Sequence, residues 1–201
     1  MLRVSSHVPQ IALGGKTQEE KSTLLGEAGK LRIVARGEWR LGEEGEGGKD
    51  PWEGRKAARW MGERGGAMVR AGLRAWAEAE AKEGVGAGGV EGRRVGVIGF
   101  GLEGSWPEWL EGKTPAEVVA LWRKKTPLWL LEGLPNLPMA QLAAEIGAKG
   151  SVETLRSRAG AGAEVRERAV SWLARGMERV VGVEGTMAGG VAVVWAMEGE
   201  K

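Results

Sequence analysis

Hydrophobic positions along the chain follow two different periods, which predicts a domain that combines helices and strands. Between Arg55 and Lys82, apolar side chains recur every three or four residues among arginines and glutamates. This spacing predicts one long amphipathic helix, weakened in its middle by the Gly65–Gly66 pair. Arg94–Phe100 is instead a short apolar run with β-branched residues, which is typical of a buried strand.

Two local signals mark helix starts in the second half of the chain. Thr114 is an N-cap residue followed by Pro115 and Glu117, so we expect a helix that continues to Trp122. A Pro-Asn-Leu-Pro turn leads into a second helix, which is expected to end at Gly147. The remaining pattern predicts a strand over 151–157, an amphipathic helix over 163–175, and strands over 179–183 and 190–197.

The first 50 residues are poorly patterned. They contain one candidate strand at 31–35 and a glycine-rich, solvated loop at 41–49. We therefore interpret residues 1–50 as an N-terminal segment and residues 51–201 as the main part of the same domain. A chain of 201 residues is long enough to bury a sizeable core in one domain.

Charge and cysteine content exclude several classes of function. The 29 basic and 27 acidic residues leave a net charge of +2, which gives no electrostatic case for binding nucleic acid or a membrane surface. The absence of cysteine rules out disulfides, thiolate metal sites and a cysteine nucleophile. Because no signal-peptide pattern and no apolar stretch of membrane-spanning length is found, we expect a cytoplasmic protein without a membrane span.

The segment at 149–163 reads KGSVETLRSRAGAGA. It resembles the nucleophile segment of β-ketoacyl synthases, which are thiolase-like condensing enzymes and read approximately KGPxxTxxTACASGA there. Gly150, Thr154, Gly162 and Ala163 are in register with that segment. Two earlier segments resemble the same family in the same order: RRVGVIG at 93–99 and NLPMAQLA at 136–143.

This resemblance covers approximately residues 59–190, about two thirds of the chain. It implies the fold of the N-terminal half of a ketosynthase, an α/β domain with a mixed sheet covered by helices. In that family the strand before the nucleophile, here 151–157, pairs with its mate across a two-fold dimer interface.

The departures from the family pattern bear on activity. Ala159 stands where the family has its nucleophilic cysteine, and Arg158 replaces the small residue before it. The family's two active-site histidines come from its C-terminal half, whereas the only histidine here is His7. A decarboxylating condensation needs a thiolate and groups that stabilise an oxyanion and handle protons. We therefore expect a pseudoenzyme with no catalytic residue, no cofactor and no metal site.

The resemblance implies an accessory role in polyketide or fatty-acid-type biosynthesis, because short ketosynthase-like proteins occur beside aryl-polyene and related pathways. The expected partners are a full-length ketosynthase, an acyl carrier protein or a second copy of the chain. Arg156 and Arg158 alternate on the predicted strand and would share a face near the missing nucleophile. They could bind a phosphopantetheine phosphate or an acidic carrier protein, or form an ordinary solvated surface.

Other motifs have both a functional and an ordinary interpretation. Gly99–Gly104 (GFGLEG) matches the dinucleotide-binding pattern after a predicted strand, so a nucleotide-binding α/β protein is the alternative function. Against it, Pro107 follows closely, and no acidic residue ends a second strand about 20 residues later. Ordinary polar, turn or packing roles are expected for Ser157, Ser171, Asn136, Glu43, Glu44, Glu46, Trp106, Trp109, Trp122 and Trp129, and His7 is expected at the surface.

Overall fold

A computed structural model describes residues 31–42, 50–83, 94–101, 112–124, 134–156 and 158–198. The elements among these residues are, in chain order, β1 (Leu31–Arg40), the 3-10 helix η2 (Lys56–Trp60), α2 (Glu63–Glu83), β2 (Val95–Phe100), α3 (Pro115–Trp122), α4 (Leu137–Glu145), β3 (Val152–Thr154), α5 (Ala161–Ala174), β4 (Arg179–Thr186) and β5 (Gly189–Met197).

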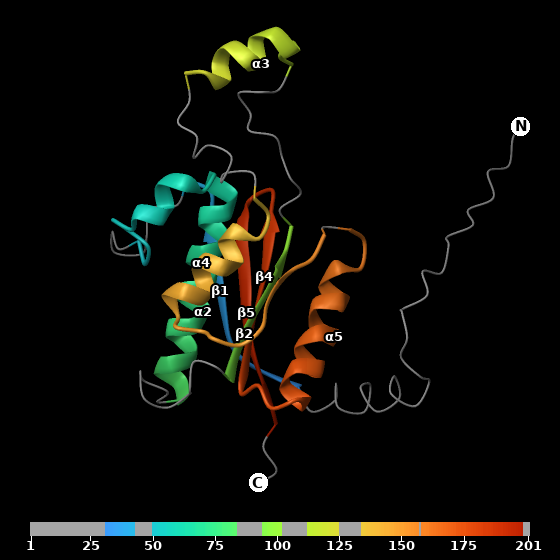
Figure 1. Cartoon of the computed structure of the whole chain (residues 1–201). Helices are drawn as coiled ribbons and strands as arrows, with labels where there is room; N and C mark the ends of the chain where they lie inside the picture. The colour runs from blue at the N-terminus through green and yellow to red at the C-terminus, as the bar shows by residue number, and fades with distance from the viewer. Residues whose placement is uncertain are drawn as a thin grey trace, which may run out of the picture.

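The described strands form one mixed sheet in the order β1-β5-β4-β2-β3 (Figure 1). β2 is parallel to β3 and β4, whereas β5 is antiparallel to β4 and β1. This confirms the predicted α/β architecture with a mixed sheet. β1 comes from the poorly patterned first 50 residues, and it pairs with β5 from Leu31, opposite Met197, to Arg40, opposite Gly189.

Helices cover both faces of this sheet, with α2 and α4 on one face and α5 on the other (Figure 1). The alternation along β5 builds the first core, because Ala192, Val194 and Ala196 are buried together with alanines of α2. The second core lies between α5 and the sheet. It contains Ile98, Leu155, Val165, Ala169, Trp172, Leu173 and Val180.

The start of α2 differs from the prediction of one helix from Arg55. A 3-10 helix occupies 56–60, the chain is extended at Met61, and α2 begins only at Glu63. Gly65 therefore lies in the first turn of α2, not in the middle of a helix. A Cβ on Gly65 would lie 3.2 Å from Cγ of Pro138, so the glycine allows α4 to approach closely.

Trp52 anchors the segment before η2 against α2 and α4. Its side chain is fully buried, and its indole N–H donates to Oε1 of Glu145 at 3.3 Å. The Arg70 guanidinium lies 5.5 Å from the Trp52 ring centre and 5.3 Å from that of Trp39. Arg70 Nε also donates to Asp50 at 2.8 Å. Burial raises the pKa of Asp50. Hydrogen bonds from Arg70 and the Trp52 backbone lower this pKa by a larger amount, so the net pKa lies below 3.8.

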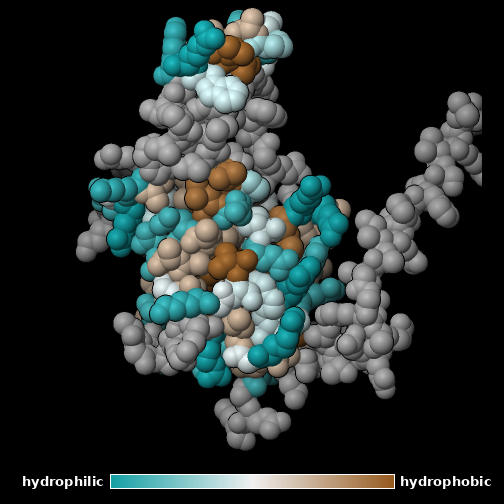
Figure 2. Space-filling model, viewed as in Figure 1, coloured by the Kyte–Doolittle hydropathy of each residue, from teal (hydrophilic) through white to brown (hydrophobic). Residues whose placement is uncertain are grey.

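The predicted start of α3 is confirmed as a capping box. The Thr114 hydroxyl accepts the backbone N–H of Glu117 at 3.4 Å, and the Glu117 carboxylate accepts the backbone N–H of Thr114 at 2.8 Å. The backbone N–H and the hydroxyl of Thr114 both donate hydrogen bonds to the Glu117 carboxylate, and they lower the pKa of Glu117. No residue of α3 is buried, and the helix stands apart from the sheet with hydrophobic side chains on its surface (Figures 1 and 2).

A charged cluster joins the end of α2 to the starts of β1 and β4. Glu83 forms one ion pair with Arg32, at 2.5 Å, and a second ion pair with Arg179. Burial raises the pKa of Glu83, but the two arginines lower it by more, and the net pKa lies below its ordinary value. The cluster therefore holds three elements together at the edge where β2 and β4 begin.

Candidate functional site

The carboxyl ends of the parallel strands meet at one edge of the sheet. β2 lies between β3 and β4 and runs parallel to both, so all three end on the same side. Beyond the end of β3, the Leu155 N–H donates to the Gly99 carbonyl at 2.8 Å, which keeps the chain beside β2. Open α/β sheets bind ligands outside the carboxyl ends of their strands, so this edge is the candidate site.

Ala159 lies at this edge, in the exposed turn between β3 and α5. The Ala161 N–H donates to the Arg158 carbonyl at 3.0 Å, and Gly160 has a φ of 86°. A glycine adopts this left-handed conformation without a steric penalty. α5 begins at Ala161, so the turn presents a methyl group two residues before a helix N-terminus.

The predicted strand over 151–157, which was expected to carry Arg156 and Arg158, is wrong in its length. β3 ends at Thr154, so neither arginine lies on a strand, and the alternation rule does not apply to them. β3 lies at the sheet edge and pairs only with β2, over the three residues from Val152 to Thr154. Beyond it the chain leaves the ladder and turns into α5.

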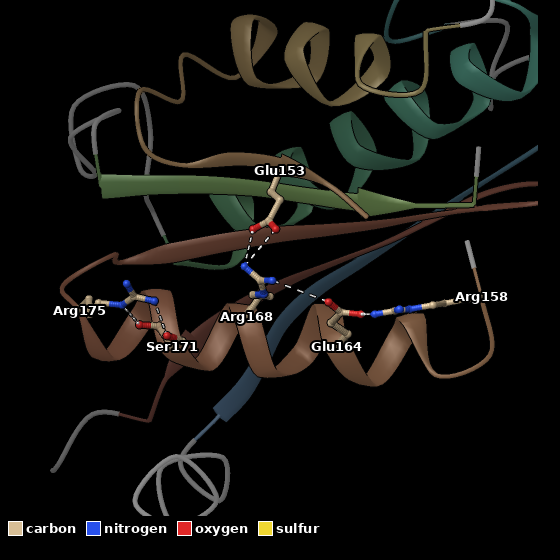
Figure 3. Close-up of polar contacts among 6 residues, drawn as sticks. All are labelled: Glu153, Arg158, Glu164, Arg168, Ser171 and Arg175. Carbon is tan, nitrogen blue, oxygen red and sulfur yellow. Dashed lines mark hydrogen bonds and ion pairs between the residues drawn. The ribbon is translucent and has the colours of Figure 1, made fainter. Parts of the chain in front are cut away.

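Arg158 belongs to a row of alternating charges that links the turn, α5 and β3 (Figure 3). Its Nη2 lies 2.6 Å from Oε2 of Glu164, whose Oε1 lies 3.8 Å from Nη2 of Arg168. Nη1 of Arg168 lies 3.1 Å from Oε1 of Glu153. The two acids and two bases cancel, so the charge of Arg158 is compensated by its neighbours. Arg156 is exposed and forms no ion pair with a described acid.

The first two glycines of the GFGLEG motif have packing reasons to be glycine. A Cβ on Gly99 would lie 2.2 Å from Sδ of Met139, which packs over β2. Gly101 has a φ of 98°, and a Cβ there would lie 2.1 Å from the Gly185 carbonyl oxygen. Gly104 lies outside the described residues. The described part of the motif is therefore accounted for by close packing of β2 against α4 and β4.

Three of the other candidates from the sequence lie among the described residues. Ser171 is buried on α5, where it accepts hydrogen bonds from Arg175 through its hydroxyl and its carbonyl. Asn136 precedes α4 in a turn and makes no side-chain cap. Trp122 is half exposed on α3. His7, Glu43, Glu44, Glu46, Ser157, Trp106, Trp109 and Trp129 lie outside the described residues.

The described residues contain no cluster of three or more histidine, cysteine, aspartate or glutamate side chains placed to bind a metal ion. None of the described helices has the length and hydrophobicity needed to cross a bilayer.

Thr154 is a feature of this edge to which the sequence assigned no role of its own. Thr154 is opposite Gly99 in the β2–β3 register, and its hydroxyl oxygen is buried without a hydrogen-bond partner. A buried hydroxyl normally finds a partner, so this one is an exception. The ion pair between Arg158 and Glu164 was also missed, because a separation of six residues across a turn has no periodic signal.

No protein family model and no curated protein sequence matches the chain. Solved structures do match its fold. A β-ketoacyl synthase from Burkholderia phymatum STM815 aligns with a TM-score of 0.60 at 14% identity, over 84% of this chain and 59% of that one. A type II ketosynthase in complex with its acyl carrier protein (AntDE:AntF) aligns with a TM-score of 0.58 at 13% identity, over 83% of this chain and 62% of that one.

The third match pairs a ketosynthase, ApeO, with its chain length factor, ApeC, from Xenorhabdus doucetiae. It has a TM-score of 0.55 at 11% identity and covers 84% of this chain and 79% of that one. This chain spans less than two thirds of the length of the first two matches, at 59% and 62%. The predicted fold is confirmed: the chain has the thiolase-like fold that these ketosynthase structures share.

Proposed function

We propose that this protein is a ketosynthase-like domain without condensing activity, which serves as an accessory partner in polyketide or fatty-acid-type biosynthesis. The observation that carries the proposal is the turn before α5, where the resemblance expects a cysteine and Ala159 supplies a methyl group. A methyl group forms no thioester, and covalent acyl transfer in this reaction type requires a nucleophile.

The neighbours of Ala159 that the structure describes offer no replacement nucleophile. The three residues after it, Gly160, Ala161 and Gly162, have only hydrogen or methyl side chains. Arg158 forms an ion pair with Glu164 at 2.6 Å. The buried Ser171 is on the third turn of α5 and accepts from Arg175. Proton transfer and oxyanion stabilisation without a covalent intermediate do not perform the condensation.

The partner side of the proposal rests on two kinds of support. The matched structures include ketosynthases solved with an acyl carrier protein and with a chain length factor, and this chain shares their fold. Arg156, exposed at the candidate edge and without a described acidic partner, is a side chain that an acidic carrier protein or a phosphopantetheine phosphate would contact. An active ketosynthase or a second copy is the other partner that the proposal includes.

Intact-protein mass spectrometry tests the missing activity. The purified chain is incubated with acyl and malonyl forms of a type II carrier protein, and we expect neither a mass increase nor release of carbon dioxide. The matched variant Ala159→Cys tests the position itself, because an exposed thiol at that turn should be alkylated by iodoacetamide. Acylation or decarboxylation by the wild-type chain would overturn the proposal.

Binding is tested separately, by biolayer interferometry against the carrier protein and against a ketosynthase from the same host. Arg156→Ala should weaken carrier binding, whereas Arg166→Ala, an exposed arginine on α5, is the matched control. If neither partner binds the wild-type chain, the accessory role is wrong even where the mass measurement shows no activity. Reduced nicotinamide is titrated in the same format, and saturable binding would favour the nucleotide-binding alternative.

A further inference from the structure

Methionine side chains differ widely in exposure across the described part of the chain. Met68 and Met139 pack in the core and are 1% and 0% exposed. Three others have intermediate exposure: Met61, Met177 and Met197. Met187 is 77% exposed. Because a thioether is oxidised only where the oxidant reaches the sulfur, Met187 is the described methionine that an oxidant reaches most easily.

Met187 lies in the turn between β4 and β5, and hydrogen bonds fix the backbone of that turn. The Thr186 hydroxyl accepts the Ala188 N–H at 3.2 Å and donates to the Gly189 carbonyl at 3.3 Å. The Leu41 N–H, directly after β1, donates to the Ala188 carbonyl at 2.8 Å. Since the turn follows the carboxyl end of β4, it holds Met187 at the candidate edge of the sheet.

The sulfur of Met187 has a cationic neighbour. Arg64 is in the first turn of α2, and its Nη2 donates to Sδ of Met187 at 3.1 Å. A thioether sulfur is a weak acceptor, so this contact contributes little while the sulfur is reduced. An oxygen bonded to the same sulfur would be a stronger acceptor, and the guanidinium would then donate a charge-assisted hydrogen bond to it.

We propose that Met187 is a site of oxidation by hydrogen peroxide, and that Arg64 stabilises the resulting sulfoxide. An electron pair of the sulfur forms a bond to one peroxide oxygen while the O–O bond breaks. The second oxygen leaves as hydroxide and takes the proton of the transferred oxygen, which gives water. The sulfur loses two electrons and the peroxide gains them. The product replaces an apolar side chain with a polar one, so peroxide changes the surface of the candidate edge.

Peptide mapping by mass spectrometry tests the selectivity of the reaction. The purified full-length chain is treated with hydrogen peroxide for increasing times and digested, and the sulfoxide fraction of each methionine is measured. We expect Met187 to be oxidised at least about tenfold faster than Met68 and Met139, because these two react only when the fold opens around them. In concentrated urea the three rates should become equal, which would attribute the selectivity to the fold.

A comparison of oxidised and reduced protein tests the role of Arg64. After a peroxide treatment short enough to modify Met187 alone, we expect the urea midpoint of the wild type to rise, because the sulfoxide oxygen gains a charge-assisted hydrogen bond. Arg64→Ala should abolish this rise, whereas Arg166→Ala, which removes an exposed arginine of α5, should retain it. Met187→Leu, treated in the same way, should show no change in midpoint.

Two results would overturn the proposal. Equal oxidation rates of Met187, Met68 and Met139 in the folded chain would show that Met187 is not a selective site. A wild-type midpoint that does not rise, or a rise that survives Arg64→Ala, would show that Arg64 does not stabilise the sulfoxide. None of these measurements involves acyl transfer or a carrier protein, so this proposal and the proposed function can fail independently.

Discussion

Replacing Gly101 with alanine probes the contact between the carboxyl ends of β2 and β4. Gly101 has a φ of 98°, and a Cβ there would lie 2.1 Å from the carbonyl oxygen and 2.7 Å from the amide nitrogen of Gly185. The left-handed conformation costs a residue with a Cβ about 1–2 kcal/mol. Pressing a methyl group into fixed backbone atoms adds about 1–3 kcal/mol. We therefore expect Gly101→Ala to lower the free energy of unfolding by about 2–5 kcal/mol.

Urea denaturation followed by tryptophan fluorescence measures this loss, since the chain has ten tryptophans. Gly147→Ala is the matched control, because Gly147 has a φ of 68° but a Cβ there would meet no heavy atom of another part of the described chain within 4 Å. It should lose only the conformational part, about 1–2 kcal/mol. If Gly101→Ala lost no more than Gly147→Ala, the close approach of Gly101 to Gly185 would be refuted.

Two further substitutions test polar groups near the sheet. Thr154→Val replaces a buried, unpartnered hydroxyl with a methyl group of the same shape, and because such a hydroxyl costs about 1–3 kcal/mol, the urea midpoint should rise; a fall would show that the hydroxyl has a partner. The folded-state pKa of Asp50 lies below 3.8, so the stability from its pair with Arg70 is complete above that value and is lost as pH falls through the folded-state pKa. The difference in free energy of unfolding between the wild type and Asp50→Asn should therefore become smaller in strong acid. Thermal unfolding at several pH values measures this difference, and a difference that does not change with pH would contradict the pairing.

Elements with short-range signals could be predicted from the sequence. α3 begins where Thr114 and Glu117 predict it, because both halves of a capping box lie within four residues. The two C-terminal strands also form as predicted, and they extend to 179–186 and 189–197 because they pair with each other across a tight turn. In these cases the interactions that stabilise the element lie within the pattern itself.

Features that depend on distant contacts could not be predicted. The late start of α2 follows from Trp52 and Pro138 packing against its first turn, which no helical period records. The end of β3 at Thr154 coincides with the end of its pairing with β2, which spans only Val152 to Thr154. At the candidate site, the resemblance singled out Ala159, and the structure shows that its turn is exposed. The pairing of Arg158 with Glu164 required the fold, because a turn brings the two side chains together.

The pairing of β1 with β5 has a consequence for how the protein is made. About 150 residues separate Arg40 from Gly189, yet the two strands are neighbours in the sheet. At 5–20 residues per second, translation takes about 8–30 s to cover that distance. Throughout this time the backbone of the nascent β1 has no strand to pair with, and an unpaired strand is a template for aggregation. The yield of native protein should therefore depend on translation rate and chaperone supply, because β1 stays unpaired until β5 has been synthesised.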